Sequence, residues 1–554
     1  MTYAPDNPLI VQSDLSLLLE VASPRYAEAR DALLAFAELV KSPEYIHTWR
    51  INRLSLWNAA AAGRSADEIV ETLSRLSRYP LPSSIEPRVR SWMDAYGKLT
   101  LTRDGEWLRL EADDDNDLEE VRRLADVQDL FEPAPDGKAL RVHPRQRGEL
   151  KQALTAAGHP IQDLAGYTDG QALEMRLSHE LPDGRTWSMR DYQREAVDAF
   201  HGGPLAGSGV IVLPCGAGKT IVGIAAMVRL GMRTLILCAG NTALRQWRRE
   251  ILRRTSLTEE DVGQYTSTIK QLRPVTLTTY QLLTWRRDPS SPPPHMGILS
   301  EAAWGLIIYD EVHLLPAPVF RESAELQARR RLGLTATLVR EDGAEGDVFA
   351  LVGPRRFDMP WKKLEEQGWI ASARCIEVRV PLSDEDRRRY IAANKSDKYK
   401  IAVKNARKVA HLESLLKQHR DDSVLVLGTY IDQLEWIARR LRIPLISGKT
   451  PAVDREALYE QFRSGALKVL LLSRVGNASL DLPNASVAVQ VAGTWGSRQE
   501  EAQRLGRILR PDPDGKPAYF YALITADSRE QEFAERRQLF LAEQGYPYRI
   551  ENVQ

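Results

Sequence analysis

Apolar and polar positions follow three different patterns along the chain. In the first hundred residues the apolar positions recur mainly at helical spacing, and the clearest face comprises Ile69, Val70, Leu73 and Leu76. Ser65 and Glu68 form a capping box at the start of that helix. Asp104-Gly105 separates two alternating apolar runs and predicts a β-hairpin. We therefore expect a mainly helical N-terminal domain over residues 1–112.

The chain between residues 113 and 186 predicts a small α/β module. Its first stretch, residues 113–120, is rich in carboxylates and is either a solvated linker or the start of a helix. Behind this stretch we expect strands near residues 140–143 and 173–177, with a helix near residues 145–156 between them. This pattern alone predicts no more than a small globular module.

From Trp187 onward short apolar runs alternate with amphipathic helices, which is typical of parallel α/β sheets. The strands expected in a first sheet are residues 209–213, 234–238, 275–278, 305–309 and 332–335. Those expected in a second sheet are residues 424–428, 469–473, 487–491 and 519–524. The sequence therefore predicts two tandem parallel-sheet domains, 187–360 and 361–554, after the helical domain and the small module.

Composition narrows the class of protein. A chain of 554 residues is too long for one hydrophobic core, so three or four domains are expected. No apolar stretch approaches the roughly 18 residues of a membrane helix, and the N-terminus lacks the pattern of a signal peptide. Three cysteines are too few for a disulfide framework or for the thiolates of an iron–sulfur cluster. We therefore expect a cytoplasmic protein that does not contact a membrane.

Charge restricts how the chain could bind a polyanion. Lys and Arg total 75, as do Asp and Glu, so binding has to rest on local basic patches. The strongest patch, residues 387–408, holds nine basic residues and one acidic residue, with Tyr390 and Tyr399 interleaved. Phosphate neutralisation and aromatic stacking would bind a single strand there, and a solvated helix face is the alternative.

The candidate chemistry begins at a glycine-rich turn after the first strand of the first sheet. This turn reads Pro214-Cys215-Gly216-Ala217-Gly218-Lys219-Thr220. In such turns the backbone N–H groups and the following helix N-terminus bind phosphate. Lys219 would reach the outer phosphates and Thr220 would bind Mg²⁺. Leu213 stands where the full pattern has glycine, so a glycine-rich turn without this role remains the alternative.

A second motif would complete a site that hydrolyses ATP. The apolar strand at 305–309 delivers Asp310 and Glu311 to its C-terminal end, where ligands bind in open α/β sheets. Asp310 can hold Mg²⁺ and Glu311 can orient or deprotonate a water molecule. We expect His313 to be an interdomain hydrogen-bond partner near the γ-phosphate and not a metal ligand.

Two more distant groups could also contact the nucleotide. Gln193, in the run that starts at Arg190, can pair with adenine N6 and N7, and capping of a helix is its alternative role. In the run that starts at Gln503, Arg507 and Arg510 lie about one helical turn apart. Two guanidiniums can stabilise charge on a transferring phosphoryl group, so we expect an interdomain cleft that closes on ATP. A basic helix face without this role is the alternative.

Two further segments could contact nucleic acid. The helix expected at residues 241–254 carries five arginines, including Arg245, while Leu244, Trp247 and Ile251 would pack on the sheet. Those arginines would contact phosphate or water. Thr278 and Thr279, at a strand end, could hydrogen-bond a sugar–phosphate backbone, although strand-end threonines are usually structural.

In their order these motifs resemble those of superfamily 2 helicases, and specifically of the XPB family of DNA helicases. The matching segments are 214–220, 310–313, 332–337 and 503–510, which resemble motifs I, II, III and VI. Arg340-Glu341-Asp342 resembles the family's RED motif, and residues 473–483 resemble its motif V, where Asn477 departs from the generic pattern. Residues 533–548 resemble the family's C-terminal segment.

The resemblance continues upstream of the two parallel-sheet domains. Residues 9–14 and 80–82 resemble the N-terminal domain of XPB-type proteins. Residues 121–186 stand where the family carries its damage-recognition domain. The two parallel-sheet domains would be RecA-like motor domains, and a thumb-like insertion would occupy about 383–410. The resemblance gives the chain a prokaryotic XPB-type architecture.

The resemblance implies an ATP-dependent 3′→5′ DNA helicase that uses Mg²⁺ and acts in repair on a single strand beside a duplex junction. It implies that the RED residues help to part the strands, and that Asp481 contacts nucleotide. The implied DNA contacts are Arg245, Thr278, Thr279, Arg340, Glu341, Asp342, Arg387, Arg388, Arg389, Lys395, Lys398, Lys400 and Arg474. Partners would be DNA and a repair nuclease or other repair protein, and the chain would be a monomer.

Three other functions remain open from the sequence. A duplex translocase that remodels DNA with little unwinding shares every motif with a helicase. An ATP-gated scaffold would not need the full hydrolytic set of Lys219, Asp310, Glu311, Arg507 and Arg510. An RNA helicase is disfavoured only by the family resemblance, since no residue visibly tests for a ribose 2′-hydroxyl.

Overall fold

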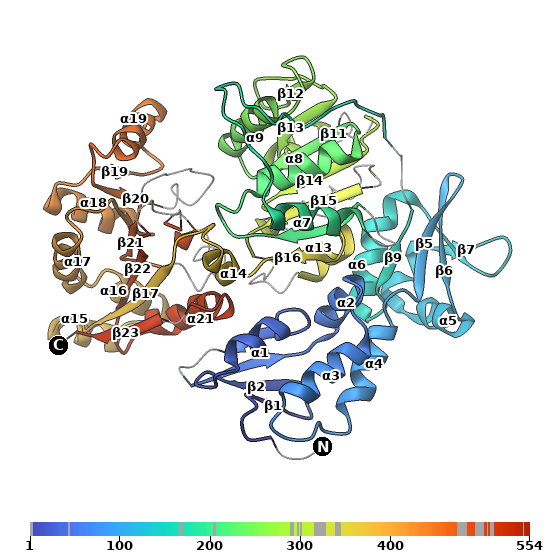
Figure 1. Cartoon of the computed structure of the whole chain (residues 1–554), viewed down its shortest axis with the longest axis horizontal. Coiled ribbons are helices and arrows are strands. Elements are labelled where there is room, and N and C mark those ends of the chain that lie inside the picture. The colour runs from blue at the N-terminus through green and yellow to red at the C-terminus, as the bar shows by residue number, and fades with distance from the viewer. Residues whose placement is uncertain are drawn as a thin grey trace. The chain divides into compact units, whose positions relative to one another are not determined.

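The computed structural model describes residues 4–41, 45–165, 170–202, 207–288, 293–295, 299, 302–314, 328, 330–337, 345–473, 485–493, 504–506, 508–509, 515–546 and 548–553 (Figure 1). The chain divides into two compact units. The first comprises Met1–Leu213 and Gly218–Met359, and the second comprises Pro360–Gln554 with Pro214–Ala217. In the described parts of the chain, no helix is long and apolar enough to cross a bilayer.

The N-terminal part of the first unit combines a small antiparallel sheet with four helices. The sheet has the order β1-β2-β4-β3 and is built from β1 (Leu9–Val11), β2 (Ser16–Glu20), β3 (Glu38–Lys41) and β4 (Ile46–Arg50). The helices are α1 (Tyr26–Leu33), α2 (Arg53–Ala61), α3 (Ala66–Leu76) and α4 (Ile85–Asp94). Ser65 and Glu68 form the predicted capping box at the start of α3. The mainly helical prediction missed the sheet, because strands this short leave too few positions for alternation to be recognised.

A five-stranded sheet, ordered β7-β8-β6-β5-β9, forms the next part of the first unit. Its elements are β5 (Leu99–Asp104), β6 (Trp107–Ala112), α5 (Asp115–Arg123), β7 (Glu132–Pro133), β8 (Leu140–Val142), α6 (Arg147–Ala157) and β9 (Ile161–Asp163). The hairpin at Asp104-Gly105 is confirmed, and the carboxylate-rich stretch begins α5.

The predicted boundary after residue 112 divides this second sheet. The hairpin pairs with β8 and β9, and its leucines share one hydrophobic core with Leu140 and Leu150. The hairpin therefore belongs with the following module, because the partners of its apolar face come later in the chain. The strand expected near residues 173–177 is wrong: Ala172 and Leu177 each form only a single isolated bridge.

A seven-stranded parallel sheet forms the rest of the first unit, with the order β12-β13-β11-β14-β15-β10-β16. Its strands are β10 (Ser208–Val212), β11 (Thr234–Cys238), β12 (Val262–Gln264), β13 (Val275–Thr279), β14 (Leu306–Asp310), β15 (Arg330–Thr335) and β16 (Arg355–Asp358). The five predicted strands are confirmed to within two residues at each end. The helices include α7 (Asp191–His201), α8 (Lys219–Leu230), α9 (Asn241–Arg254), α10 (Tyr280–Leu283) and α13 (Glu345–Leu351).

The second unit contains another seven-stranded parallel sheet, ordered β19-β20-β18-β21-β22-β17-β23. Its strands are β17 (Ala373–Val380), β18 (Val424–Leu427), β19 (Leu445–Ile446), β20 (Val469–Leu472), β21 (Val487–Gln490), β22 (Ala518–Thr525) and β23 (Tyr548–Asn552). All four predicted strands are present. The α/β fold class with two parallel-sheet domains is therefore confirmed.

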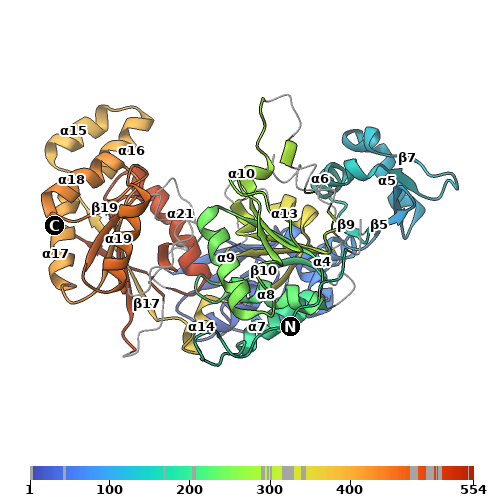
Figure 2. The ribbon, with the colours of Figure 1, turned by 90° about the horizontal axis from the view of Figure 1, so that it is seen from above.

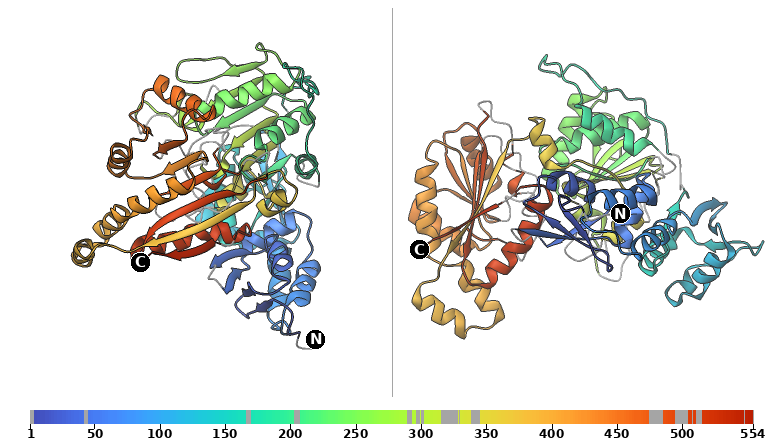
Figure 3. Two further views of the ribbon diagram at one scale, coloured as in Figure 1. Left: turned by 60° about the vertical axis from the view of Figure 1, so that its left-hand side comes forward. Right: turned by 60° about the horizontal axis from the view of Figure 1, so that its bottom comes forward.

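Helices surround the second sheet and include a helical pair at one end of the unit. They are α14 (Trp361–Glu366), α15 (Asp384–Ala392), α16 (Lys395–Val403), α17 (Arg407–Gln418), α18 (Ile431–Leu441), α19 (Ala452–Arg463) and α21 (Arg529–Glu543). Helices α15 and α16 pack together, and α16 packs on α21, as can be followed in Figure 2 and in Figure 3. This pair occupies the position of the predicted thumb-like insertion.

Candidate nucleotide site and nucleic-acid interface

The loop from β10 to α8 needs glycine for conformational and steric reasons. Gly216 and Gly218 both have φ of +83°, in the left-handed region that side chains rarely adopt. A Cβ on Gly218 would also lie 2.6 Å from Nε2 of Gln193. Gly218 caps α8, a 12-residue helix whose first N–H groups have no intrahelical partner. Such a helix start attracts a phosphate group.

Leu213, the residue that departs from the full phosphate-loop pattern, has a packing role. It is fully buried in the core, and its N–H donates to the carbonyl of Thr335 at the end of β15 (2.9 Å). The departure therefore exchanges glycine for an apolar anchor at the end of β10. It removes no group that would hold phosphate.

Three charged side chains meet at the C-terminal end of β14. Nζ of Lys219 lies 3.3 Å from Oε1 of Glu311. Burial, together with the charge of Glu311, raises the pKa of Asp310 to about 7. Burial also opposes ionisation of Glu311, but the charges of Lys219 and His313 outweigh it, so the pKa of Glu311 is lowered. The structure thus brings together the predicted residues of motifs I and II, with two carboxyl groups facing one ammonium group.

Glu311 has a strained backbone. Its φ of +52° is in the left-handed region, which costs a residue with a side chain about 1–2 kcal/mol. Its Oε2 atom is buried and accepts no hydrogen bond from the residues that the structure describes. The hydroxyl of Tyr280 donates to the carbonyl of the preceding residue, Asp310 (2.7 Å), and helps to hold this turn. Strain of this kind concentrates at functional sites.

His313 connects the end of β14 to the end of β15. Its Nδ1 lies 2.6 Å from Oγ1 of Thr335 and 3.4 Å from Oε2 of Glu311. Since the Thr335 hydroxyl donates to the carbonyl of Thr337 (2.6 Å), the same oxygen can accept from a protonated Nδ1 of His313. Thr335 belongs to the same sheet as His313, and the expected role of His313 as an interdomain hydrogen-bond partner stays a prediction. β15 is the neighbour of β14, so a side chain just beyond β14 reaches it first.

Trp247 is a site residue that the sequence pattern assigned only to packing. It is 1% exposed, and its side chain hydrogen-bonds the carboxyl group of Asp310, which opposes the rise in the pKa of that group. A Cβ on Gly223 of α8 would meet the Trp247 ring at 2.5 Å, so glycine makes room for the indole. Helix α9 is therefore joined directly to the end of β14. The only signal in the sequence was a tryptophan at a core position of an arginine-rich helix.

Gln193 has the capping role that the sequence left as an alternative. Its Oε1 accepts a hydrogen bond from the N–H of Arg190 (3.0 Å), and the side chain is 2% exposed. Arg190 in turn donates to the hydroxyl of Tyr192 (3.0 Å). The proximity of Gln193 to Gly218 places its amide beside the phosphate loop. Its contact with adenine stays a prediction.

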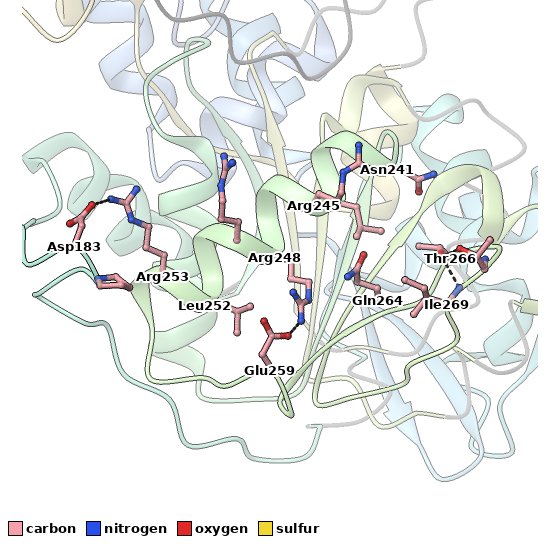
Figure 4. A pocket seen from close by; sticks show the side chains of 14 residues that line it. Asp183, Asn241, Arg245, Arg248, Leu252, Arg253, Glu259, Gln264, Thr266 and Ile269 are labelled. Atoms are coloured by element: carbon pink, nitrogen blue, oxygen red, sulfur yellow. Dashed lines mark hydrogen bonds and ion pairs between the residues drawn. The ribbon is translucent and has the colours of Figure 1, made fainter. Parts of the chain in front are cut away.

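A groove of about 810 Å³ follows the exposed face of α9 (Figure 4). Arg245 lies near the start of this helix, and its side chain is exposed. Two other arginines carry partners: Arg248 forms an ion pair with Glu259, and Arg253 lies 2.6 Å from Asp183. The opposite face is buried, as predicted, through Leu244, Trp247 and Ile251. The groove thus presents guanidiniums whose charge is partly balanced by acids.

The predicted DNA contact of Thr278 is contradicted, and that of Thr279 is weakened. Thr278 is fully buried in β13, and Thr279 is 6% exposed with its hydroxyl accepting from the N–H of Leu282 at the start of α10. All five positions of β13 are buried, so both of its faces are covered, while β12 and β11 pair with its two edges. Both threonine side chains therefore lie inside the domain.

Comparison with known proteins identifies the family. A family described as "ERCC3/RAD25/XPB C-terminal helicase" matches residues 364–553, "Type III restriction enzyme, res subunit" matches 186–340, and "Helicase conserved C-terminal domain" matches 9–132. A DNA 3'-5' helicase XPB of Kineococcus radiotolerans is 52% identical over 98% of this chain and 96% of its own. One of Mycobacterium tuberculosis is 50% identical over 99% and 98%. The chain belongs to the XPB family of DNA 3'-5' helicases.

The more distant matches include a curated relative and a solved structure. One relative, from Saccharomyces cerevisiae, is 30% identical over 98% of this chain and 71% of its own. Its printed name is "General transcription and DNA repair factor IIH helicase/translocase subunit XPB/SSL2". Among solved structures, the ATP-dependent Type ISP restriction-modification enzyme LlaBIII bound to DNA superposes with a TM-score of 0.49 at 12% identity, over 67% of this chain and 31% of that one. Members of the XPB family are ATP-dependent helicases, so this chain is an enzyme that uses a nucleotide.

The helical pair at the XPB-family thumb position presents most of its predicted cations to solvent. Arg387, Arg388, Arg389, Lys395 and Lys400 are exposed, and Lys398 is half-buried with its ammonium 5.6 Å from the centre of the Tyr390 ring. The expected stacking role of Tyr399 is wrong. Its side chain is 1% exposed, donates to the carbonyl of Gly493 (2.9 Å) and packs edge-on against Phe533. Tyr399 lies on the side of α16 that faces the sheet.

Lys408 is the other exception to the basic patch. Its ammonium lies 2.7 Å from Glu530, and both side chains are completely buried. Burial lowers the pKa of Lys408, and the charge of Glu530 opposes that shift. This lysine therefore belongs to the core of the second unit and not to a surface that binds phosphate.

Several residues that the XPB-family motifs predict lie outside the described residues. They are Arg340, Glu341, Asp342, Arg474, Asp481, Gln503, Arg507 and Arg510. Their roles stay predictions.

Proposed function

We propose that this chain hydrolyses ATP at the end of β14 and couples hydrolysis to 3′→5′ movement along DNA, which separates the strands of a duplex. The observation that carries the proposal is the cluster of Lys219, Asp310 and the strained Glu311 beside a glycine-rich helix start. A binding scaffold would not need two adjacent carboxyl groups there, because holding both close together is unfavourable without a cation.

The donor set fits Mg²⁺ together with a nucleotide. In the ranges that the structure describes, no group of three or more His, Cys, Asp or Glu side chains is placed to hold a metal ion. Mg²⁺ bound to a nucleotide typically takes one or two protein ligands and fills its other positions with phosphate and water. Thr220 and Asp310 would supply those protein ligands. The bound ion would offset phosphate charge and favour ionisation of Asp310.

The remaining residues of the site would position ATP and move a proton. Residues 214–218 and the start of α8 would hold the phosphate chain through backbone N–H groups, and Lys219 would pair with its outer oxygens. Glu311 would accept a proton from the attacking water at its Oε2 atom. Arg507 and Arg510 keep their predicted role of stabilising charge on the transferred group.

Trp247 would couple the site of ATP hydrolysis to the surface that binds DNA. Its indole holds Asp310, and α9, which carries it, presents Arg245 on its opposite face. A change at Asp310 on binding or release of nucleotide would act on α9 through one side chain. The DNA-binding surface would comprise this helix and the exposed cations of α15 and α16.

The experiment that tests this function is strand displacement with ATP and Mg²⁺ on duplexes matched except for a 3′ or a 5′ single-stranded tail. We expect displacement of the 3′-tailed duplex alone and its loss in Glu311→Gln, which keeps the side-chain shape but removes the base. Preferential displacement of the 5′-tailed duplex would contradict the polarity. Unchanged displacement by Glu311→Gln would contradict the assigned site.

A second candidate is a duplex translocase with little unwinding of its own. It is favoured by the printed name of the Saccharomyces cerevisiae relative, which is a helicase/translocase subunit. DNA-stimulated ATP hydrolysis without displacement of either duplex would support this candidate. That relative is also part of a DNA repair factor, so we propose that this chain acts in repair beside a partner such as a nuclease.

A further inference from the structure

A tight hairpin at residues 264–271 separates two different surfaces of the first parallel-sheet domain. Its strands are joined by hydrogen bonds from the N–H of Gln271 to the carbonyl of Gln264 (3.0 Å) and from the N–H of Thr266 to the carbonyl of Ile269 (2.7 Å). Thr266 and Ile269 line the arginine groove of α9 (Figure 4). Tyr265 and Lys270, which pair across the same hairpin, are not among the residues that line this groove.

Three aromatic rings form a connected cluster beside the hairpin. The hydroxyl of Tyr265 lies 3.2 Å from Nδ1 of His295, and the two rings meet edge to face at 5.7 Å. The Trp285 ring lies 5.9 Å from the His295 ring at 41°. Nζ of Lys270 lies 4.4 Å from the centre of the Tyr265 ring. The cluster therefore holds Trp285 from one side through aromatic contacts.

The Trp285 side chain is half exposed to solvent. It is 49% exposed, whereas Tyr265 behind it is 4% exposed. A half-exposed indole presents a flat apolar face that a second ring can contact. The segments that carry the cluster, residues 265–272 and 284–288, contain three basic residues and one acidic residue. An open indole among cations suits a ligand that combines flat rings with negative charge.

The cluster is joined to the nucleotide site by one short helix. Trp285 extends the last turn of α10, since its N–H donates to the carbonyl of Leu282 (3.3 Å). The first residue of α10, Tyr280, donates its hydroxyl to the carbonyl of Asp310. A ligand held at Trp285 would therefore be connected to the site of hydrolysis through a single turn of helix.

We propose that Trp285, supported by His295 and Tyr265, is a platform on which one unpaired base of single-stranded DNA stacks. Lys270 and Arg287 neutralise the phosphates on either side of that base. This inference rests on the proposed helicase function and adds a defined contact to it. Stacking on an aromatic face is tolerant of sequence, as a translocating enzyme requires. It would also keep one base out of the duplex at the junction.

The test is an abasic scan with a 3′-tailed duplex, in which the junction fixes the register of the tail. One abasic residue is moved along the tail, and affinity is measured by fluorescence anisotropy without ATP. We expect wild-type protein to lose about 10-fold in affinity at one tail position, since a stacked base contributes about 1–3 kcal/mol. Trp285→Ala should lose a similar factor with the intact tail and be insensitive to the abasic residue at that position. Trp285→Phe should restore most of the affinity.

Trp436→Ala is the matched control, because Trp436 is 38% exposed, lies beneath the guanidinium of Arg440 and belongs to the second unit. It should bind all tails as wild type does. If wild-type protein unwinds DNA but loses affinity at no position of the abasic residue, the platform would be overturned and the helicase proposal would stand. The platform would also be overturned if the abasic residue lowers the affinity of Trp285→Ala by the same factor as it lowers that of wild type, because effects at independent sites add. A wild-type protein that neither binds the tailed duplex nor hydrolyses ATP with it would overturn both proposals.

Discussion

Lys219 and Glu311 form an ion pair, with Nζ 3.3 Å from Oε1, that joins the first residue of α8 to the residue after β14. Phosphate is a competing partner for the same ammonium group. If Lys219 turns to the phosphates of ATP, as proposed, the charge that lowers the pKa of Glu311 would move away, and Glu311 would become a stronger base. The pair would thus keep the glutamate ionised before ATP binds, and its separation would increase the basicity of the glutamate afterwards.

Replacement of Lys219 by alanine should remove ATP hydrolysis and leave DNA binding largely intact. We expect at least about a 100-fold fall in the rate of DNA-stimulated hydrolysis, because a positioned charge on the phosphoryl group is lost. Phosphate release measures hydrolysis, and anisotropy with labelled DNA measures binding. Lys468→Ala, an exposed lysine of the second unit, is the control. Undiminished hydrolysis by the purified variant would contradict the assigned site.

Trp247→Phe should impair hydrolysis although the ring would still fill the core. The substitution removes the hydrogen bond to Asp310, so the pKa of Asp310 should rise further and its affinity for Mg²⁺ should fall. A hydrogen bond to a charged group contributes about 1.5–3 kcal/mol, which predicts roughly a 10-fold fall in rate. Higher Mg²⁺ concentrations should recover part of the lost rate.

Trp304→Phe is the matched control for Trp247. Its indole is also fully buried in the same domain, but it donates to the carbonyl of Leu299 (2.6 Å) away from Asp310. The control should lower the melting temperature without changing the Mg²⁺ dependence. If both variants shift the Mg²⁺ dependence equally, Trp247 acts only through packing.

Asp163→Asn should destabilise the five-stranded module. The carboxylate binds Arg147 through two hydrogen bonds of 2.7 Å and Lys151 through one of 2.8 Å, with all three side chains nearly buried. Removal of the negative charge leaves two buried cations, which costs about 3–5 kcal/mol. Thermal unfolding of the protein, with limited proteolysis used to detect the opening of residues 97–165, would measure the loss of stability. Asp126→Asn, an exposed acid of the same module, should have little effect.

The same network predicts a specific dependence on pH. The pKa of Asp163 is lowered from 3.8, since the charges of Arg147 and Lys151 outweigh the effect of its burial. Its stabilisation is therefore present above the ordinary pKa and is lost as the pH falls below 3.8. Burial lowers the pKa of Lys151 to about 8, so this lysine is charged in both folded and unfolded chains at lower pH.

Below pH 3.8 the difference in stability between wild type and Asp163→Asn should consequently shrink, because only wild type loses a stabilising carboxylate there. Melting temperatures of both proteins across this range measure the difference. A difference that grows as the pH falls below 3.8 would contradict the assigned ion pairs.

Local motifs were predictable from the sequence, whereas contacts between distant elements were not. The glycine-rich loop, Asp310 and Glu311 were recognised because their spacing alone defines a strand end and a helix start. Thr278 and Tyr399 looked like surface contacts, but burial depends on which elements cover them, and no local pattern records that. Trp247 was assigned to packing for the same reason, since its partner Asp310 lies on another strand.

For the basic residues of the thumb-like helices, the sequence predicts the charge and the structure shows which side chains are exposed. Replacement of Arg387, Arg388 and Arg389 by alanine should weaken DNA binding and reduce its dependence on salt, because all three side chains are exposed on α15. If each contacts one phosphate, the slope of log affinity against log salt should become shallower by about 2–3. Anisotropy at a series of salt concentrations measures this slope. Arg439→Ala with Arg440→Ala, on exposed positions of α18, should change it little. An unchanged slope in the triple variant would show that this surface, although exposed and basic, does not contact the DNA backbone.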